Sequence, residues 1–147
     1  MERPVFSCRQ SATFLTKEDG AGTHARAAPG KMGKLTTHVL DTSHGCPGAG
    51  IALALYRVDG RRRSLLRELA TNADGRCDEP LLQGESLVAG VYELHFHVAD
   101  YYRRRGVALP EPAFLDVVVV RVGLSDQGHY HVPLLVSPYG YSTYRGS

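Results

Sequence analysis

The sequence predicts an all-β fold, a two-sheet sandwich or a barrel, in a single domain. From Leu35 onward, short strand-like runs are separated by turn signals roughly every ten to fifteen residues, a spacing typical of such folds. No long apolar pattern with a helical period competes with these runs. The length of 147 residues is enough for one domain with a substantial core and too short for two.

Residues 1–33 differ from the rest of the chain. They are rich in Gly, Ala, Ser, Thr and charged side chains and show no sustained periodicity. We expect a flexible N-terminal leader over residues 1–33 and a folded domain over residues 34–147. Because Met32 lies just before the first strand-like run, we predict that a chain beginning at Met32 folds as the full chain does. Failure of that truncated chain to fold, measured by circular dichroism, would contradict the prediction.

Three expected strands open the domain, over residues 35–41, 51–58 and about 64–71. The loop over residues 42–48 follows the first strand, and its Gly and Pro residues cannot continue a central strand. Asp59-Gly60 forms the turn after the second strand. The third strand ends at the Asn-Ala-Asp-Gly turn of residues 72–75, and only short irregular segments are expected over residues 76–89.

The clearest strand spans Val91 to Ala99. One set of alternate side chains points to the core, namely Tyr92, Leu94, Phe96 and Val98. The other set should face water and contains Glu93, His95 and His97. Residues 99–105 lack this alternation and precede Gly106, which predicts a short helix of one or two turns, the only helix that we expect.

The last expected strands cover residues 114–122, 128–136 and 140–145. The segment Val117 to Val120 is apolar on both faces, which in so small a chain suggests that a second subunit covers one face. A Ser-Pro-Tyr-Gly turn at residues 137–140 joins the final two strands into a hairpin. On the first strand of that hairpin, His129 and His131 share the face opposite the core.

The charge distribution argues against a nucleic-acid partner. The formal net charge is +2; residues 1–33 carry five basic and three acidic side chains, and residues 34–147 carry twelve of each, so the domain itself is neutral. Residues 61–63 and 103–105 are arginine triplets, but no alternating aromatic and basic pattern connects them. We expect a solvated loop and a solvated helix end at these positions.

The cysteines and the hydropathy favour a cytoplasmic protein. Cys8, Cys46 and Cys77 cannot all pair, and their spacing fits neither a metal site nor a disulfide framework, which favours a reducing compartment. No stretch approaches the roughly 18 consecutive apolar residues of a membrane span, so no membrane partner is expected. The peroxisome and the periplasm stay open as alternatives.

Three segments resemble a known family. They are LTTHVLD at residues 35–41, TNADGR at 71–76, and HYHVPLL at 129–135 running into SPYGYSTYRGS at the end of the chain. From about residue 34 to the last residue, the chain resembles the 5-hydroxyisourate hydrolases, the transthyretin-related enzymes of urate breakdown. The most specific element is the terminal Tyr-Arg-Gly-Ser, because transthyretin shares the preceding hairpin but not this tetrapeptide.

The resemblance implies a transthyretin-like two-sheet β-sandwich with one short helix. It implies a homotetramer, a dimer of dimers with active sites where two dimers meet, and it implies no metal or organic cofactor. The implied reaction is hydrolysis of the small molecule 5-hydroxyisourate to 2-oxo-4-hydroxy-4-carboxy-5-ureidoimidazoline in purine catabolism. Catalytic roles are implied for His38, Arg76 and His131, and substrate binding for Tyr144, Arg145, Gly146 and Ser147.

These residue types suit the opening of a cyclic amide or imide. The reaction needs a base for water, a donor for the developing oxyanion and an acid for the departing nitrogen. Histidine can act as base and then as acid near neutral pH, and arginine offers a fixed fork of donors for oxygen atoms. We hypothesise that His131, with His38, deprotonates the water while Arg76 orients the substrate; which histidine is the base stays open.

Other interpretations need different features. A transthyretin-like carrier would hold a hydrophobic ligand in a central channel, which the bulky Tyr144 and Arg145 should narrow. A structural scaffold would tolerate replacement of the catalytic candidates. The pairs His95 with His97 and His129 with His131 could each clasp zinc, since alternate strand residues project the same way. A catalytic zinc site needs three protein ligands and the spacing identifies no third, so we expect no metal.

Overall fold

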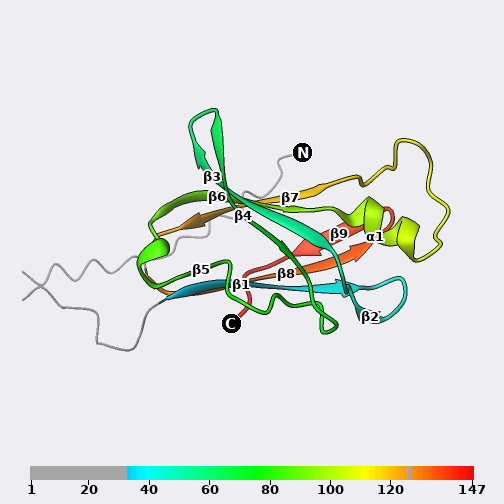
Figure 1. Cartoon of the computed structure of the whole chain (residues 1–147), viewed down its shortest axis with the longest axis horizontal. Helices are drawn as coiled ribbons and strands as arrows, with labels where there is room; N and C mark the ends of the chain where they lie inside the picture. The colour runs from blue at the N-terminus through cyan, green and yellow to red at the C-terminus, as the bar shows by residue number, and fades with distance from the viewer. Residues whose placement is uncertain (1–32, 126) are drawn as a thin grey trace, which may run out of the picture.

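The fold is a sandwich of two β-sheets packed face to face (Figure 1). The structure, a computed structural model, describes residues 33–125 and 127–147. The predicted leader, except for its last residue, therefore lies outside the described residues, and the division into residues 1–33 and 34–147 stays a prediction. Of the two all-β folds that the sequence allowed, the sandwich is confirmed and the barrel is not.

The first sheet carries the segments with the family resemblance. Its strands are, in spatial order, β2 (Cys46–Pro47), β1 (Lys34–Asp41), β8 (His129–Ser137) and β9 (Gly140–Thr143), and β5 (Leu82–Gln83) also pairs with β1. Strands β1 and β8 run parallel although about 95 residues separate them along the chain. Alternate residues of β1 are buried, among them Leu35 and Val39, so one face of this sheet packs on the core.

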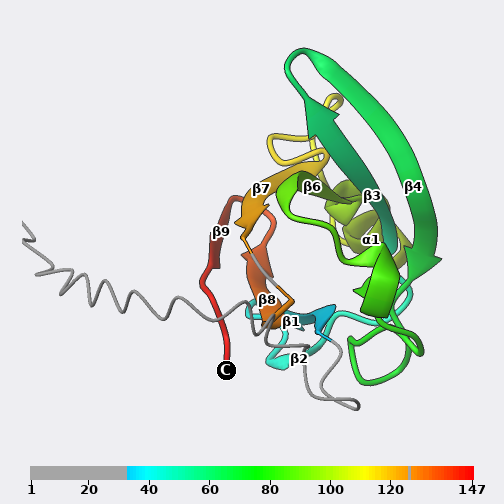
Figure 2. The same cartoon turned by 90° about the vertical axis from the view of Figure 1, so that its left-hand side faces the viewer.

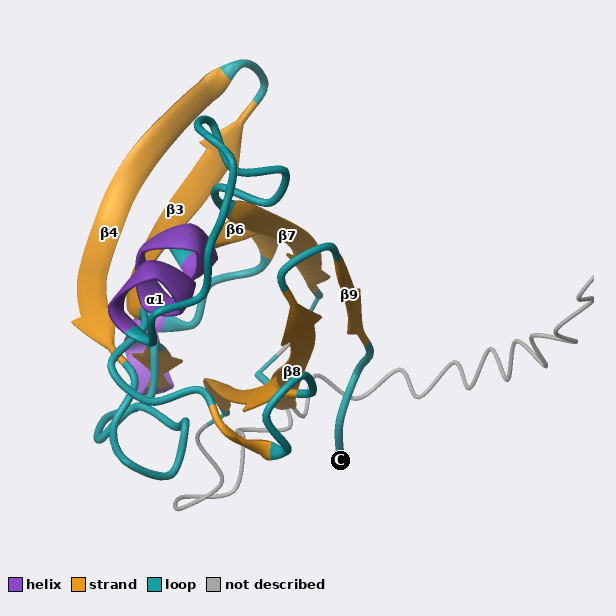
Figure 3. Ribbon diagram, turned by 90° about the vertical axis from the view of Figure 1, so that its right-hand side faces the viewer, coloured by secondary structure: helices purple, strands orange, loops and turns teal. Residues whose placement is uncertain are grey.

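The second sheet is antiparallel throughout. Its order is β4 (Arg62–Ala70), β3 (Ala52–Asp59), β6 (Gly90–Phe96) and β7 (Val118–Leu124). Tyr92, Leu94 and Phe96 of β6 are buried between the sheets, as the alternation predicted. The helix α1 (Val98–Arg104) lies at one end of the sandwich (Figure 3), and a 3₁₀ turn, η1 (Gly84–Ser86), precedes β6. Within the described ranges, neither helical segment is long and apolar enough to cross a membrane.

Several strand ends differ from the prediction for one shared reason. Strand β6 ends at Phe96 and α1 begins at Val98, whereas the sequence predicted a strand to residue 99. Because Phe96 pairs with Val118, β7 begins there rather than at residue 114. A strand extends only as far as its neighbour, and alternation within one segment does not show where the neighbour ends.

The outer face of β6 is not the wet face that the sequence predicted. Glu93 is only 2% exposed, and both its carboxylate oxygens accept a hydrogen bond from Nε of Arg63, each at 2.8 Å. His95 lies beside them, with Nε2 3.6 Å from Glu93 Oε1 and its ring against Tyr56. The prediction was wrong at Glu93, because an arginine from the β3–β4 hairpin covers this carboxylate.

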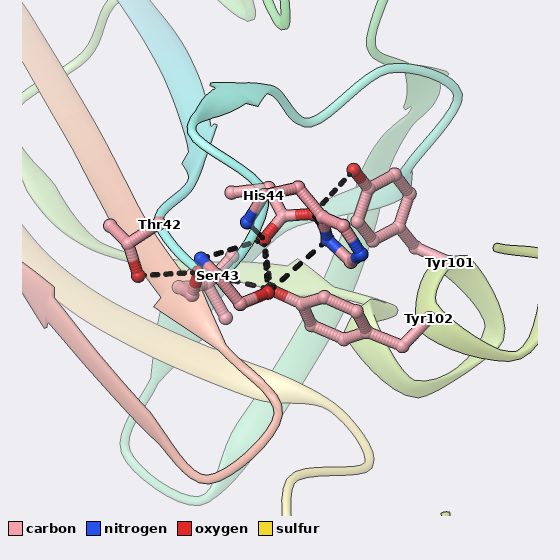
Figure 4. Close-up of polar contacts among 7 residues, drawn as sticks. Thr42, Ser43, His44, Tyr101 and Tyr102 are labelled. Carbon is pink, nitrogen blue, oxygen red and sulfur yellow. Dashed lines mark hydrogen bonds and ion pairs between the residues drawn. The ribbon is translucent and has the colours of Figure 1, made fainter. Parts of the chain in front are cut away.

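A buried carboxylate ties the end of β1 to α1. Asp41 is fully buried and accepts hydrogen bonds from the hydroxyls of Tyr101 at 2.8 Å and Tyr102 at 3.0 Å. Ser43 and His44, in the loop after β1, donate to the same carboxylate at 2.6 Å. Figure 4 shows both tyrosine rings of α1 and the His44 ring converging on this point. The helix is therefore fixed to the sheet by a polar contact inside the core.

Candidate active site

The parallel pairing of β1 and β8 places two of the predicted histidines on one surface. Thr36 is the partner of His131, and His38 is the partner of Pro133. The neighbours Thr37 and Val132 are buried, so Thr36, His38 and His131 lie on the opposite, outer face of the sheet. Two segments that are distant in the sequence thus bring both imidazoles to the same side of the sandwich.

The Asn-Ala-Asp-Gly-Arg turn places a guanidinium beside them. The side-chain oxygen of Asn72 accepts the backbone N–H of Arg76 at 3.1 Å, which closes the turn. The turn then docks on β1, where Val39 N–H donates to the Gly75 carbonyl at 2.8 Å. Gly75 has φ +75°, and a Cβ there would lie 2.4 Å from the Val39 carbonyl oxygen, so only glycine fits. As a result, Arg76 forms an isolated β-bridge with His38.

The end of the chain returns to the same face. The Gly146 N–H donates to the carbonyl of His131 at 2.8 Å, which holds the tail along β8. Figure 2 shows the C-terminus on the outer side of the first sheet. Between the tail and the strands is a cleft of about 640 Å³, lined by Lys34, Thr36, Arg76, His129, Tyr130, His131, Tyr144, Gly146 and Ser147.

The structure brings most of the predicted site residues to this cleft. Arg76, His131, Tyr144, Gly146 and Ser147 all line it. His38 is not among the lining residues, but it lies beside Arg76 and close enough to His131 to lower the pKa of that imidazole.

Arg145 is placed differently. Its guanidinium lies 4.7 Å from the centre of the Tyr130 ring, a cation–π contact, and it lines a neighbouring groove between β7 and β8 rather than the cleft.

Besides Tyr130, which was predicted to lie in the core, sequence reasoning missed three cleft residues on the outer face, namely Lys34, Thr36 and His129. Their signal was the period of two along a strand. Residues 34 and 36 share a face with His38, and residue 129 shares a face with His131, so each of these three residues is displaced by an even number from a predicted one.

The proposed zinc-binding pair of His95 and His97 does not form, because β6 ends at Phe96 and His97 lies beyond the strand. Among the residues that the structure describes, no three His, Cys, Asp or Glu side chains could hold a metal ion together.

The electrostatic environment of His131 suits a base. Burial lowers the pKa of His131 below its ordinary value of 6.5, and the nearby Arg76 and His38 lower it further, in that order. Each effect disfavours the imidazolium. At neutral pH the ring is therefore neutral and able to accept a proton.

The direction of this shift predicts the acid side of the pH profile. A base with a lowered pKa stays unprotonated to lower pH, so kcat/KM for a hydrolysis at this cleft should fall with a midpoint below pH 6.5. Replacing Arg76 with Gln removes one cause of the shift, so the midpoint of the remaining activity should move to higher pH. Initial rates between pH 5 and pH 8 for both proteins check this, and a midpoint that moves downward in the variant would contradict it.

The tail contact predicts a second effect. A Cβ on Gly146 would lie 2.6 Å from Cδ2 of His131, so Gly146→Ala must displace either the tail or the imidazole. The sequence predicts a catalytic role for His131, and small displacements of a catalytic group are costly, so we expect about a tenfold loss of activity. Gly140→Ala is the control, because its Cβ meets nothing closer than Ser137 Oγ at 3.7 Å. Equal activity of the two variants in the same assay would contradict the prediction.

This geometry defines a class of protein. A two-sheet sandwich with β1 and β8 parallel, carrying imidazoles, a guanidinium and the chain end on one outer face, is a transthyretin-like protein with a site suited to hydrolysis. Residues 35–146 match the model of the HIUase/Transthyretin family. The chain belongs to that family.

The similar proteins include both 5-hydroxyisourate hydrolases and a transthyretin, the two kinds of protein in the family name. The chain is 63% identical over 124 residues to a 5-hydroxyisourate hydrolase of Pseudomonas aeruginosa, a match that covers 84% of this chain and 98% of that protein. The structure of Klebsiella pneumoniae 5-hydroxyisourate hydrolase is similar with a TM-score of 0.66 and 34% identity, covering 79% of this chain and all of that one. Sea bream transthyretin in complex with thyroxine gives a TM-score of 0.69 at 26% identity, over 77% of this chain and 94% of that one.

Proposed function

We propose that this chain hydrolyses 5-hydroxyisourate to 2-oxo-4-hydroxy-4-carboxy-5-ureidoimidazoline. The observation that carries the proposal is the convergence of His131, Arg76 and the chain end on one cleft, with His38 alongside. The much higher identity to a named hydrolase than to a hormone-binding transthyretin supports this activity over a carrier.

The residues divide the chemistry between them. In the proposed reaction, His131 accepts a proton from water as the water oxygen attacks a ring carbonyl carbon. Arg76 donates to the oxygen on which negative charge develops. The carbon–nitrogen bond then breaks, the imidazolium returns its proton to the departing nitrogen, and the carbonyl becomes the carboxyl group of the product. His38, beside Arg76, helps to orient the water.

One assay tests the activity. Urate oxidase generates 5-hydroxyisourate from urate, and its ultraviolet absorbance is followed with and without the protein. The proposal expects decay in proportion to the concentration of the protein. Decay at the spontaneous rate, with the protein folded, would defeat it.

We propose that the working form is a homotetramer. Strands β7 and β9 are the edge strands of the two sheets and lie on the same side of the sandwich (Figure 2). Val119 of β7 is 41% exposed, and an apolar groove of about 370 Å³ runs between β7 and the β8–β9 hairpin. Unpaired edges beside an apolar groove favour association with a second copy. Light scattering during gel filtration should give four times the chain mass.

We also propose a reducing, cytoplasmic location. Cys46 and Cys77 are both free thiols, which supports a compartment without disulfide formation. Thiol titration of the unfolded protein, purified without reductant, should count all three cysteines of the chain as reactive.

A further inference from the structure

Thr36 is next to His131 and is not used by the proposed reaction. Its hydroxyl oxygen lies 2.9 Å from Nδ1 of His131, a hydrogen bond between side chains that the parallel register places opposite each other. The next residue, Thr37, uses its hydroxyl differently: it is buried and donates to the Val132 carbonyl at 2.7 Å. Two adjacent threonines therefore have separate partners, a backbone carbonyl for one and an imidazole for the other.

The hydroxyl of Thr36 has one hydrogen to donate, and this limits the tautomer of the ring. Thr36 Oγ1 also lies 3.5 Å from the Tyr130 carbonyl, to which it can donate. If Nδ1 of His131 carries the proton, Nδ1–H donates to Thr36 and Thr36 donates to Tyr130, which gives two hydrogen bonds. If Nε2 carries the proton instead, the hydroxyl donates to Nδ1 and only one bond forms. The arrangement therefore favours the tautomer with the proton on Nδ1.

The remaining contacts of the ring agree with this assignment. Gly146 packs so closely on the Cδ2 edge that a Cβ there would be 2.6 Å away. With Thr36 bonded to Nδ1 and the tail packed against Cδ2, Nε2 is the remaining nitrogen of a ring that lines the cleft. An unprotonated Nε2 is the form that a base requires.

We propose that Thr36 is a positioning residue, which holds His131 with the proton on Nδ1 and the lone pair of Nε2 toward the substrate. It acts through the imidazole and not on the substrate. The inference rests on the proposed function, since it explains how His131 serves as the base. It also offers a reason for choosing His131 over His38, a choice that the sequence left open.

Three variants test the proposal. Thr36→Val keeps the shape and removes the hydroxyl, Thr36→Ser restores the hydroxyl, and Thr37→Val removes the adjacent hydroxyl that contacts only backbone. We expect Thr36→Val to lower kcat about tenfold with little change in KM, and Thr36→Ser to recover most of the loss. Thr37→Val should lower the stability but keep the pH profile of kcat. Equal losses in the two valine variants, or wild-type kcat in Thr36→Val, would overturn the proposal.

A second measurement separates this inference from the proposed function. The ¹⁵N chemical shifts of His131 report which ring nitrogen carries the proton, and they need no substrate. We expect protonated Nδ1 in the wild type and a shift of population toward protonated Nε2 in Thr36→Val. The same tautomer in both proteins would overturn the positioning role even if the enzyme is active. A tautomer change in a protein that does not accelerate hydroxyisourate decay would instead leave the positioning role standing and defeat the hydrolase.

Discussion

Replacing His131 with Asn is expected to lower kcat for 5-hydroxyisourate hydrolysis by about a thousandfold without changing the oligomeric state. General base catalysis contributes roughly 10²–10⁴ in rate, and Asn keeps a polar side chain of similar reach but accepts no proton at neutral pH. The imidazole is half-buried on an outer sheet face, so its loss leaves the core between the sheets unchanged. The decay assay gives the rate, and gel filtration gives the assembly.

The control for this variant is His97→Asn. His97 is also half-buried, lies at the start of α1 rather than at the cleft, and occupies a position that asparagine readily takes before a helix. It should keep the wild-type rate. If His131→Asn turns over substrate at the wild-type rate, the catalytic assignment is wrong, whereas a loss of rate accompanied by dissociation would point to assembly instead.

Short-range signals in the sequence predicted much of the fold and of the site. Alternation located β6 and β8, a strand-like run ended by a Gly- and Pro-containing loop located β1, and the Asn-Ala-Asp-Gly turn located the loop that carries Arg76. In each case the sequence pattern and the strand or turn that it predicts lie within about ten residues of each other. The resemblance to a family supplied the link between His38, Arg76 and His131, which no spacing along the chain could have given.

The features that were missed depend on contacts between distant segments. The bond from Thr36 to His131 needs the register of a parallel pair separated by 95 residues, and no local pattern specifies that register. The burial of Glu93 needs Arg63 from the β3–β4 hairpin to lie over it. The direction of Arg145, in the tail after β9, depends on the Tyr130 ring of β8. Strand alternation gives the face of a residue but not its partner.

Asp41→Asn is expected to lower the free energy of unfolding by about 3 kcal/mol, because it disrupts a buried charged group with several donors. Oδ2 accepts from Tyr101 and His44, while Oδ1 accepts from Ser43 and Tyr102. Asparagine has the same size, but its NH₂ group would replace one carboxylate oxygen. That group is a donor and would face the two donors that bond to this oxygen in the wild type. Thermal melting at a fixed protein concentration measures the loss. The control is Asp59→Asn at the exposed β3–β4 turn, which should change the free energy of unfolding by less than about 0.5 kcal/mol.

The pH dependence of stability tests the charge of Asp41 separately from its shape. Burial alone would raise the pKa of Asp41, but hydrogen bonds from Ser43, Tyr101, His44 and Tyr102 outweigh it and lower the pKa from 3.8 to about 2. A carboxyl with a lowered folded-state pKa stabilises the fold above the unfolded-state value, and that stability is lost as the pH falls through the folded-state value. The wild type should therefore lose about 1.8 kcal/mol between pH 4 and pH 2 through this group. Asp41→Asn should lack that part of the decline, so equally steep curves for the two proteins would show that the carboxylate is not held as a charged acceptor between the sheet and α1.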